Sequence, residues 1–176
     1  MHAPTPGRLI VALLATAPLT AQAPPAAGAP FPDQLAYLLS QASAGFAELR
    51  ADSIGPGMWH ARYFLASNLD SATALAASSI SELARQHADG RPGKAIVGVF
   101  ALALSPPGDS AVFKHYRELI SAALPGWQNH SPGAGDWSEC ADPRRGRELI
   151  LSSGRTAGGQ LLLMLSITVH PDATCS

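Results

Sequence analysis

The sequence predicts an α+β fold: a mostly antiparallel sheet of four to five strands, two longer helices packed on one of its faces, and a C-terminal β-hairpin closed by a disulfide bond. Three observations lead to this prediction. Residues 33–50 and 109–124 carry apolar side chains at helical spacing. Residues 95–104 form an apolar run typical of a central strand. Two further apolar runs, 148–152 and 161–169, flank a glycine-rich turn.

The first 23 residues have the pattern of a secretory signal peptide. Arg8 supplies the basic charge, residues 9–15 form a short apolar run, and Ala21-Gln22-Ala23 ends the segment with small residues. The apolar run is far shorter than the roughly 20 residues that span a bilayer, and Pro18 interrupts it. We therefore expect export to the periplasm or the extracellular space, cleavage before Pro24, and no stable membrane span after signal removal.

The mature chain is expected to form one domain. Residues 24–31 are rich in Pro, Ala and Gly, which predicts a disordered linker, and residues 32–176 suit a single α+β domain. Of the 12 basic residues Arg8 lies in the signal, so 11 basic and 13 acidic residues give the mature chain a net charge of −2. This balance offers no general attraction for nucleic acid or anionic lipid.

The domain is expected to begin with a helix and a strand. Pro32 in the first turn and Asp33 at the cap position fit a helix start, and the helical spacing continues to Arg50. After a glycine-rich loop, residues 58–66 have the aromatic density of a half-buried strand.

The next segment, 71–88, is open to two interpretations. Its alanine-rich composition favours a helix, whereas alternation in its first half favours a strand. We predict a strand over residues 71–77 and a helix over residues 79–87. Gly and Pro residues between 88 and 93 then end the helix.

The middle of the chain predicts a central strand followed by a helix. The run 95–104 lacks a polar face, so we expect it to be buried on both sides of the sheet. Asp109 or Ser110 can cap the following helix, which faces the core with Tyr116 and Ile120. Residues 127–141 are expected to form a loop.

The two cysteines of the chain lie just outside the C-terminal hairpin. Cys140 precedes Glu148 by eight residues, and Cys175 follows Val169 by six. Paired positions in a tight hairpin have a constant sum of residue numbers, here 313 to 315, so the cysteines meet at its open end. We predict a Cys140–Cys175 disulfide, which closes a loop of 36 residues and stabilises the fold by about 4 kcal/mol.

The tripeptide Gly108-Asp109-Ser110 follows an apolar strand and opens a helix. It resembles the Gly-Asp-Ser signature of the GDSL hydrolases. The resemblance implies a doubly wound fold, Ser110 as the nucleophile, and an Asp and a His close together near the C-terminus. His170-Pro171-Asp172 carries these two residue types in another order and spacing. The alternative is a helix cap, in which Asp109 accepts hydrogen bonds from first-turn amides.

Motifs for other chemistry are absent from the sequence. It has no glycine-rich nucleotide-binding motif, no Gly-x-Ser-x-Gly and no Cys-x-x-Cys. The mature chain has five histidines, none of them paired at a metal-binding spacing, so we expect no metal and no cofactor. His60 and His170 fall on predicted strands, where they either converge or point separately to solvent.

Four residues are candidates for contact with a partner. Trp127 and Trp137 bracket the loop before the hairpin, where they either anchor a partner or fold back onto the core. Arg144 and Arg145 belong to a basic cluster beside Cys140, which either grips an acidic partner or forms a solvated turn.

Together these features predict a non-catalytic exported bacterial domain that binds an envelope protein or other envelope component, or a small ligand. The alternative is a small secreted GDSL-like serine hydrolase with Ser110 as its nucleophile. We expect no nucleic-acid partner.

Overall fold

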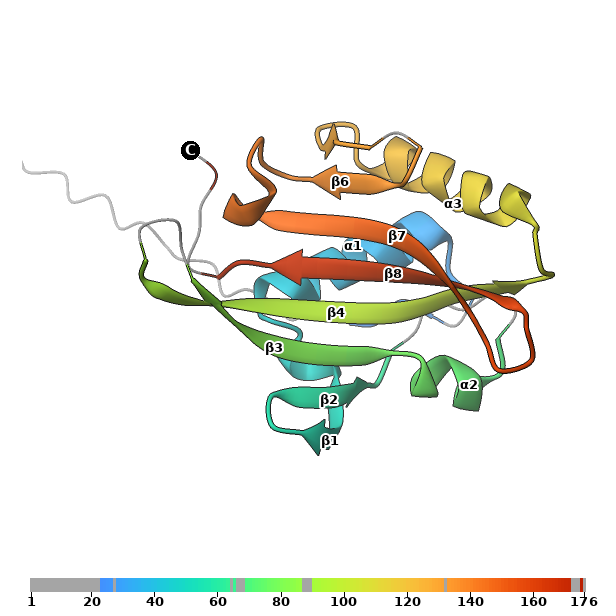
Figure 1. The fold of residues 1–176 in the computed structure, drawn as a ribbon, viewed down its shortest axis with the longest axis horizontal. Helices are drawn as coiled ribbons and strands as arrows, with labels where there is room; N and C mark the ends of the chain where they lie inside the picture. The colour runs from blue at the N-terminus through green and yellow to red at the C-terminus, as the bar shows by residue number, and fades with distance from the viewer. Residues whose placement is uncertain are drawn as a thin grey trace, which may run out of the picture.

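The computed structural model describes residues 23–26, 28–63, 65, 69–86, 90–131, 133–171 and 175. In this part of the chain eight strands form one antiparallel sheet with the order β1-β2-β3-β4-β8-β7-β6-β5 (Figure 1). The strands are β1 (Arg50–Gly55), β2 (Met58–Ala61), β3 (Ser79–Gln86), β4 (Pro92–Ser105), β5 (Gln128–Asn129), β6 (Asp136–Ser138), β7 (Arg147–Arg155) and β8 (Leu161–Val169). The predicted signal peptide, up to residue 22, lies outside the described residues.

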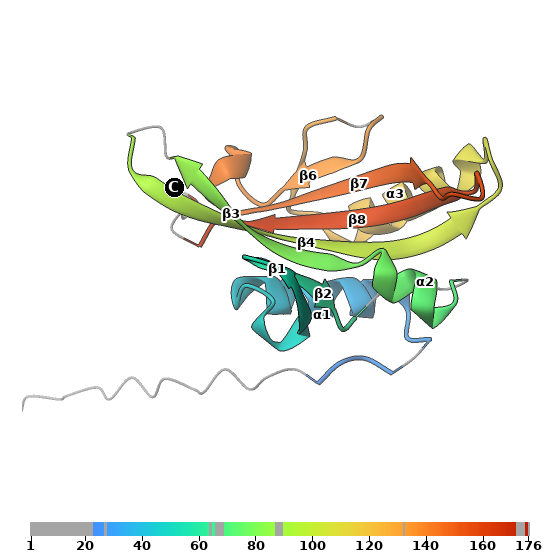
Figure 2. The same cartoon turned by 60° about the horizontal axis from the view of Figure 1, so that its bottom comes forward.

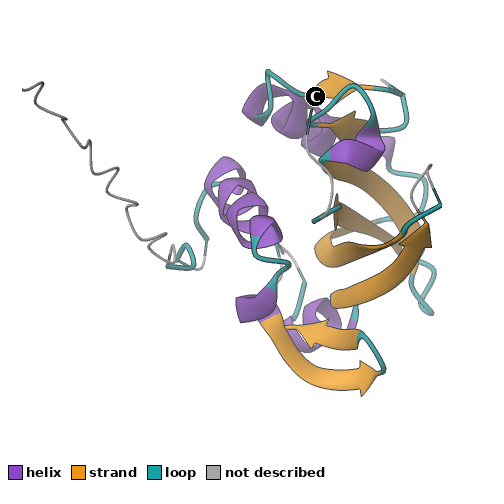
Figure 3. Ribbon diagram, turned by 90° about the vertical axis from the view of Figure 1, so that its left-hand side faces the viewer, coloured by secondary structure: helices purple, strands orange, loops and turns teal. Residues whose placement is uncertain are grey.

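The two longer helices lie on the same face of the sheet (Figure 2). The described residues contain α1 (Phe31–Ser43), α2 (Ser71–Ala76), α3 (Ser110–Ala123) and two 3₁₀ turns, η1 (Ala47–Leu49) and η2 (Pro143–Arg145). Figure 3 shows the sheet curving around α1. None of these helices is long and apolar enough to cross a membrane.

The core lies between the sheet and these helices. Phe31 of α1 packs edge-on against Tyr116 of α3, with ring centroids 5.3 Å apart. Trp137 of β6 donates a hydrogen bond to Ser121 of α3 at 3.3 Å. The largest side chains with almost no exposed surface all belong to this layer: Leu35, Leu38, Phe46, Ile80, Phe100, Leu102, Ile120, Trp137, Leu149, Leu151, Leu163 and Leu165.

The predicted fold, a sheet of four to five strands with two longer helices, is wrong. Within the described residues the sheet has eight strands and is accompanied by three α-helices. The strands that the sequence did not reveal include β1, β5 and β6, which have six, two and three residues. β5 and β6 are too short to show an alternating pattern, and β1 has a mostly polar sequence without one. All three are strands because a neighbouring strand satisfies their backbone groups.

The segment after the second strand has the reverse of the predicted order. Residues 71–76 are helical, and Asp70 caps this helix by accepting a hydrogen bond from the Thr73 amide at 2.9 Å. Residues 79–86 form β3 instead of a helix. Ile80 is fully buried in β3, so burial between β2 and β4 outweighs the helical propensity of the segment.

The first helix ends earlier than its spacing predicts. Gly45 and Phe46 both have positive φ angles, of 63° and 57°, which an α-helix cannot continue through. A side chain at Gly45 would place its Cβ 2.7 Å from the Cδ1 of Ile96, so this turn requires glycine. The turn sends the chain into β1.

The apolar run 95–104 occupies the centre of the sheet, in β4. Ile96, Phe100 and Leu102 are buried toward the helices. Val97 and Val99 point to the opposite face and are only half-buried. The expectation that both sides of this strand are buried is therefore wrong, because no helix in the described residues covers that opposite face.

The predicted C-terminal hairpin and its disulfide are confirmed. Strands β7 and β8 pair from Arg147↔Val169 to Arg155↔Leu161, a constant sum of 316 that lies one above the predicted range. Cys140 and Cys175 form a disulfide with their Cα atoms 5.4 Å apart. The bridge therefore joins the stretch before β7 to the stretch after β8.

Candidate functional site

The face of the sheet turned away from α1 and α3, here called the open face, carries the candidate site. Residues opposite each other in neighbouring strands point to the same face, so the pairing register defines this surface. One row across five strands consists of residues that pair in sequence: Ser81, Val97, Thr168, Glu148 and Ser138. Only Glu148 in this row is charged. Large apolar side chains on this face are partly exposed, such as Leu83 at 51%.

At one end of the open face lies a hollow of about 680 Å³, here called the η2 depression. Four segments build it: the end of β3, η2, the start of β7 directly after η2, and the residue after β8. Its lining residues are Arg85, Gln86, Pro143, Arg144, Glu148 and His170. A volume of this size is within the range of small-ligand sites.

One wall of the η2 depression is fixed by hydrogen bonds around η2. Arg85 donates from Nη1 to the backbone oxygen of Arg144 at 3.0 Å, which joins β3 to η2. Asp142 caps η2 by accepting a bond from the Arg144 amide at 3.0 Å. Asp142 also lies 3.8 Å from the guanidinium of Arg145. These contacts set the backbone from which Arg144 extends.

The disulfide supports the same wall. A Cβ at Gly146 would clash with the sulfur of Cys140 and lie 3.4 Å from that of Cys175, so the bridge packs directly on this glycine. Cys140 precedes η2, and Cys175 follows His170 by five residues. The bridge therefore holds two segments that line the depression.

Glu148 also lines the depression, and its surroundings are unusual for a carboxylate. Among the ion pairs of the described residues none includes Glu148. Burial raises the pKa of Glu148 above its ordinary value, the charge of Asp136 raises this pKa further, and His130 partly opposes the increase. The Oδ1 of Asp136 is itself buried without a hydrogen-bond partner.

His130 and Ser138 form a pair close to these carboxylates, but the pair holds a loop. The Ser138 hydroxyl donates its single proton to the backbone oxygen of Cys140. It therefore accepts from the Nε2 of His130, which lies within hydrogen-bond distance. A nucleophilic serine needs the reverse arrangement, with the histidine accepting the hydroxyl proton. Ser138 is also completely buried.

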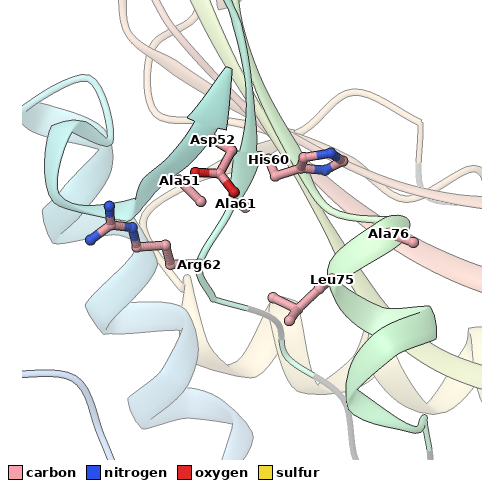
Figure 4. A pocket seen from close by; sticks show the side chains of 7 residues that line it. All are labelled: Ala51, Asp52, His60, Ala61, Arg62, Leu75 and Ala76. Atoms are coloured by element: carbon pink, nitrogen blue, oxygen red, sulfur yellow. The ribbon is translucent and has the colours of Figure 1, made fainter. Parts of the chain in front are cut away.

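A second hollow of about 540 Å³ lies between β1, β2 and α2 (Figure 4). Its floor is mostly apolar, and its polar residues are Asp52, His60 and Arg62. All three are exposed, and no hydrogen bond or ion pair among the described residues links them. Figure 4 shows the charged end of Arg62 extending away from His60. This hollow therefore gathers fewer convergent polar groups than the η2 depression.

The structure separates the four residues nominated as partner contacts. Trp137 is 1% exposed and packs in the core, so it has no surface to offer a partner. Trp127 is half-buried against the core, 5.7 Å from the guanidinium of Arg147. Arg144 and Arg145 are exposed in η2, and only Arg144 lines the depression.

The other residues considered for chemistry lie apart. His60 pairs with Ser79, the first residue of β3. His170 lines the η2 depression together with Gln86, the last residue of β3. The two histidines therefore lie near opposite ends of β3 and do not converge. Asp109 caps α3 by accepting a bond from the Ala111 amide at 2.9 Å. Ser110, next to it, is exposed. No cluster of three or more His, Cys, Asp or Glu in the described residues can hold a metal ion.

Three residues of the depression escaped the sequence reasoning as site residues, Arg85, Gln86 and Glu148, and His170 was considered only for catalysis or metal binding. Arg85 and Gln86 lay in a segment predicted as helix, which gives no pairing with β4 and no shared surface with η2. Residues 79–86 show no clean alternation, because Glu82 lies on the side of Ile80 and Leu83 on the side of Ser81 and Arg85, so the pattern did not reveal a strand that places Arg85 on the open face.

Comparison of the chain with models of protein families, with curated proteins and with solved structures finds no match.

Proposed function

We propose that this protein is an exported, non-catalytic binding domain that holds the anionic group of a small ligand in the η2 depression. The proposal rests on one observation: Arg85 and Arg144, 59 residues apart in the chain, line the same hollow of small-ligand size. A carboxylate, phosphate or sulfate group is the natural counterpart of two guanidinium groups.

The hydrogen-bond inventory supports this proposal. An arginine has five N–H donors, and the described contact of Arg85 with the backbone of Arg144 uses one nitrogen, Nη1. Gln86 and His170 add further polar groups to the lining. A small ligand is favoured over a flat acidic partner surface because the groups line a hollow formed by four segments.

Export is the second part of the proposal. It rests on the signal-like first 23 residues and on the use of both cysteines in a disulfide, which is typical of oxidising compartments. N-terminal sequencing of secreted protein should find a chain starting near Pro24. A secreted chain that retains Met1 would contradict it.

The binding proposal is tested with two variants of equal charge change. Arg85→Gln with Arg144→Gln removes both guanidiniums of the depression, whereas Arg62→Gln with Arg155→Gln removes two exposed arginines elsewhere. We expect the first pair to weaken sulfate binding by about tenfold or more in calorimetry, since charged hydrogen bonds contribute roughly 1.5–3 kcal/mol each. Equal losses in both pairs would overturn the proposal, because binding would then follow net charge alone.

A further inference from the structure

Glu148 is the one carboxylate that lines the η2 depression. It lies in the same cross-strand row as Thr168 and Ser138, on the same face as Arg85. An ionised Glu148 places a negative charge in the hollow where two arginines would receive an anion. A neutral Glu148 leaves that hollow with positive charge and with a carboxyl proton that can be donated.

Charged and titratable groups reach Glu148 from each neighbouring segment. Asp136 of β6 and His130 after β5 act on it from the sheet edge. Arg85 of β3, Arg144 of η2 and His170 after β8 share the depression with it. Its neighbour on β8 is Thr168, which carries no charge. Burial and the Asp136 carboxylate together raise the pKa of Glu148, so its proton is held to higher pH than on an ordinary glutamate.

We propose that Glu148 makes ligand binding pH-sensitive: protonation of its carboxylate increases the affinity of the η2 depression for an anion. This inference rests on the proposed function, because it concerns the regulation of the same site. The sign follows from charge alone, since the ligand group and the ionised carboxylate repel each other. Removing one such charge inside a partly desolvated hollow should change the affinity about tenfold.

Sulfate is the probe for the test, because its charge stays constant over the pH range that matters. Sodium sulfate is titrated into the full chain at pH 4.5 and pH 7.5, with sodium chloride of equal ionic strength as the blank. The variants are Glu148→Gln, which mimics the protonated carboxyl, and Glu118→Gln, which neutralises an exposed carboxylate on α3. Amide spectra verify that both variants keep the native fold.

At pH 7.5 we expect Glu148→Gln to bind sulfate about tenfold more tightly than the unchanged protein, and Glu118→Gln to bind it equally well. The ratio of affinities between pH 4.5 and pH 7.5 should fall by the same factor in Glu148→Gln. An unaltered ratio in Glu148→Gln overturns the pH sensitivity while the binding function stands. A failure of sulfate to bind at either pH overturns the proposed function itself.

Discussion

Arg147 and Glu148 are neighbours on β7 that point to opposite faces of the sheet. On the helix-covered face, the Nε and Nη2 of Arg147 donate to both carboxylate oxygens of Glu139, at 2.9 and 2.7 Å. Its Nη1 donates to the backbone oxygen of Leu39 at 3.0 Å. On the open face, Glu148 has no ion pair within the described residues. Arg147 thus has hydrogen-bond partners for all three of its side-chain nitrogens on one face, whereas Glu148 has no ionic partner on the other.

This difference shows where a function is to be sought. The helix-covered face holds the close-packed side chains that stabilise the fold, whereas the open face combines half-buried apolar residues with a charged hollow. Residues whose hydrogen bonds are already satisfied contribute to stability, and unmet charged groups in a concave surface are available to a ligand. Changes on the two faces should therefore have different consequences.

The largest effect is expected from the disulfide, which supports the open-face site. Cys140→Ser with Cys175→Ser should lower the melting temperature by roughly 10 °C, because the bridge contributes about 4 kcal/mol in the chain-entropy model. Hydrogen exchange should still find the amides of β4 and α1 protected, while sulfate binding is lost with the position of η2. Retention of full sulfate affinity in this variant would show that the bridge does not shape the site.

The next effect concerns packing on the helix-covered face. A Cβ at Gly98 would lie 2.7 and 2.9 Å from ring atoms of Phe100 and 3.0 Å from the ring of Phe46. These two rings are fully buried, so Gly98→Ala should destabilise the protein by about 2 kcal/mol in urea unfolding. The matched change on the open face is Val97→Thr, at a half-buried position of the same strand, and we expect it to cost less than about 1 kcal/mol. Equal costs would remove the distinction between the faces.

The smallest effect concerns two glutamates whose contributions to protein stability change with pH in opposite directions. The hydrogen bond from Arg147 lowers the pKa of Glu139, so its contribution to stability is present above its unfolded pKa and is lost as pH falls. The pKa of Glu148 is raised, so the folded protein holds this proton more tightly and loses stability as pH rises through its range.

At pH 7, Glu139→Gln should therefore destabilise the protein by about 1 kcal/mol or less, since this carboxylate is partly exposed, and Glu148→Gln should stabilise it slightly. Both differences should be smaller at pH 3, because protonation turns a glutamate into the neutral form that glutamine mimics. Unfolding in urea at the two pH values measures them, and the same sign for both variants at pH 7 would contradict the account.

The sequence allowed the hairpin and its disulfide to be predicted because that information is local. Two apolar runs, a turn and two cysteines at symmetric positions specify one pairing of strands. The sum of paired residue numbers in the structure is one above the predicted range. The helix over 110–123 was predictable for the same reason, since Asp109 caps it and Tyr116 and Ile120 repeat at helical spacing.

The rest of the fold depends on contacts between distant segments. Residues 79–86 have no strong propensity of their own, and they become a strand because β2 and β4 pair with them on either side. The helix expected up to Arg50 stops at Gly45 and Phe46 because the turn packs on Ile96, far along the chain. The candidate site also depends on contacts between distant segments, since Arg85 meets Arg144 only when the complete sheet has formed.

The most direct test of the account maps an anion onto the whole molecule. Sodium sulfate is titrated into isotopically labelled protein, and NMR follows the side-chain N–H signals of the arginines and of Gln86. We predict that Arg85, Gln86 and Arg144 shift and saturate with one common affinity, while Arg147, already bonded to Glu139, does not. Shifts of equal size at Arg62 and Arg155, or the largest shifts at Arg147, would contradict the assignment of the open face as the binding surface.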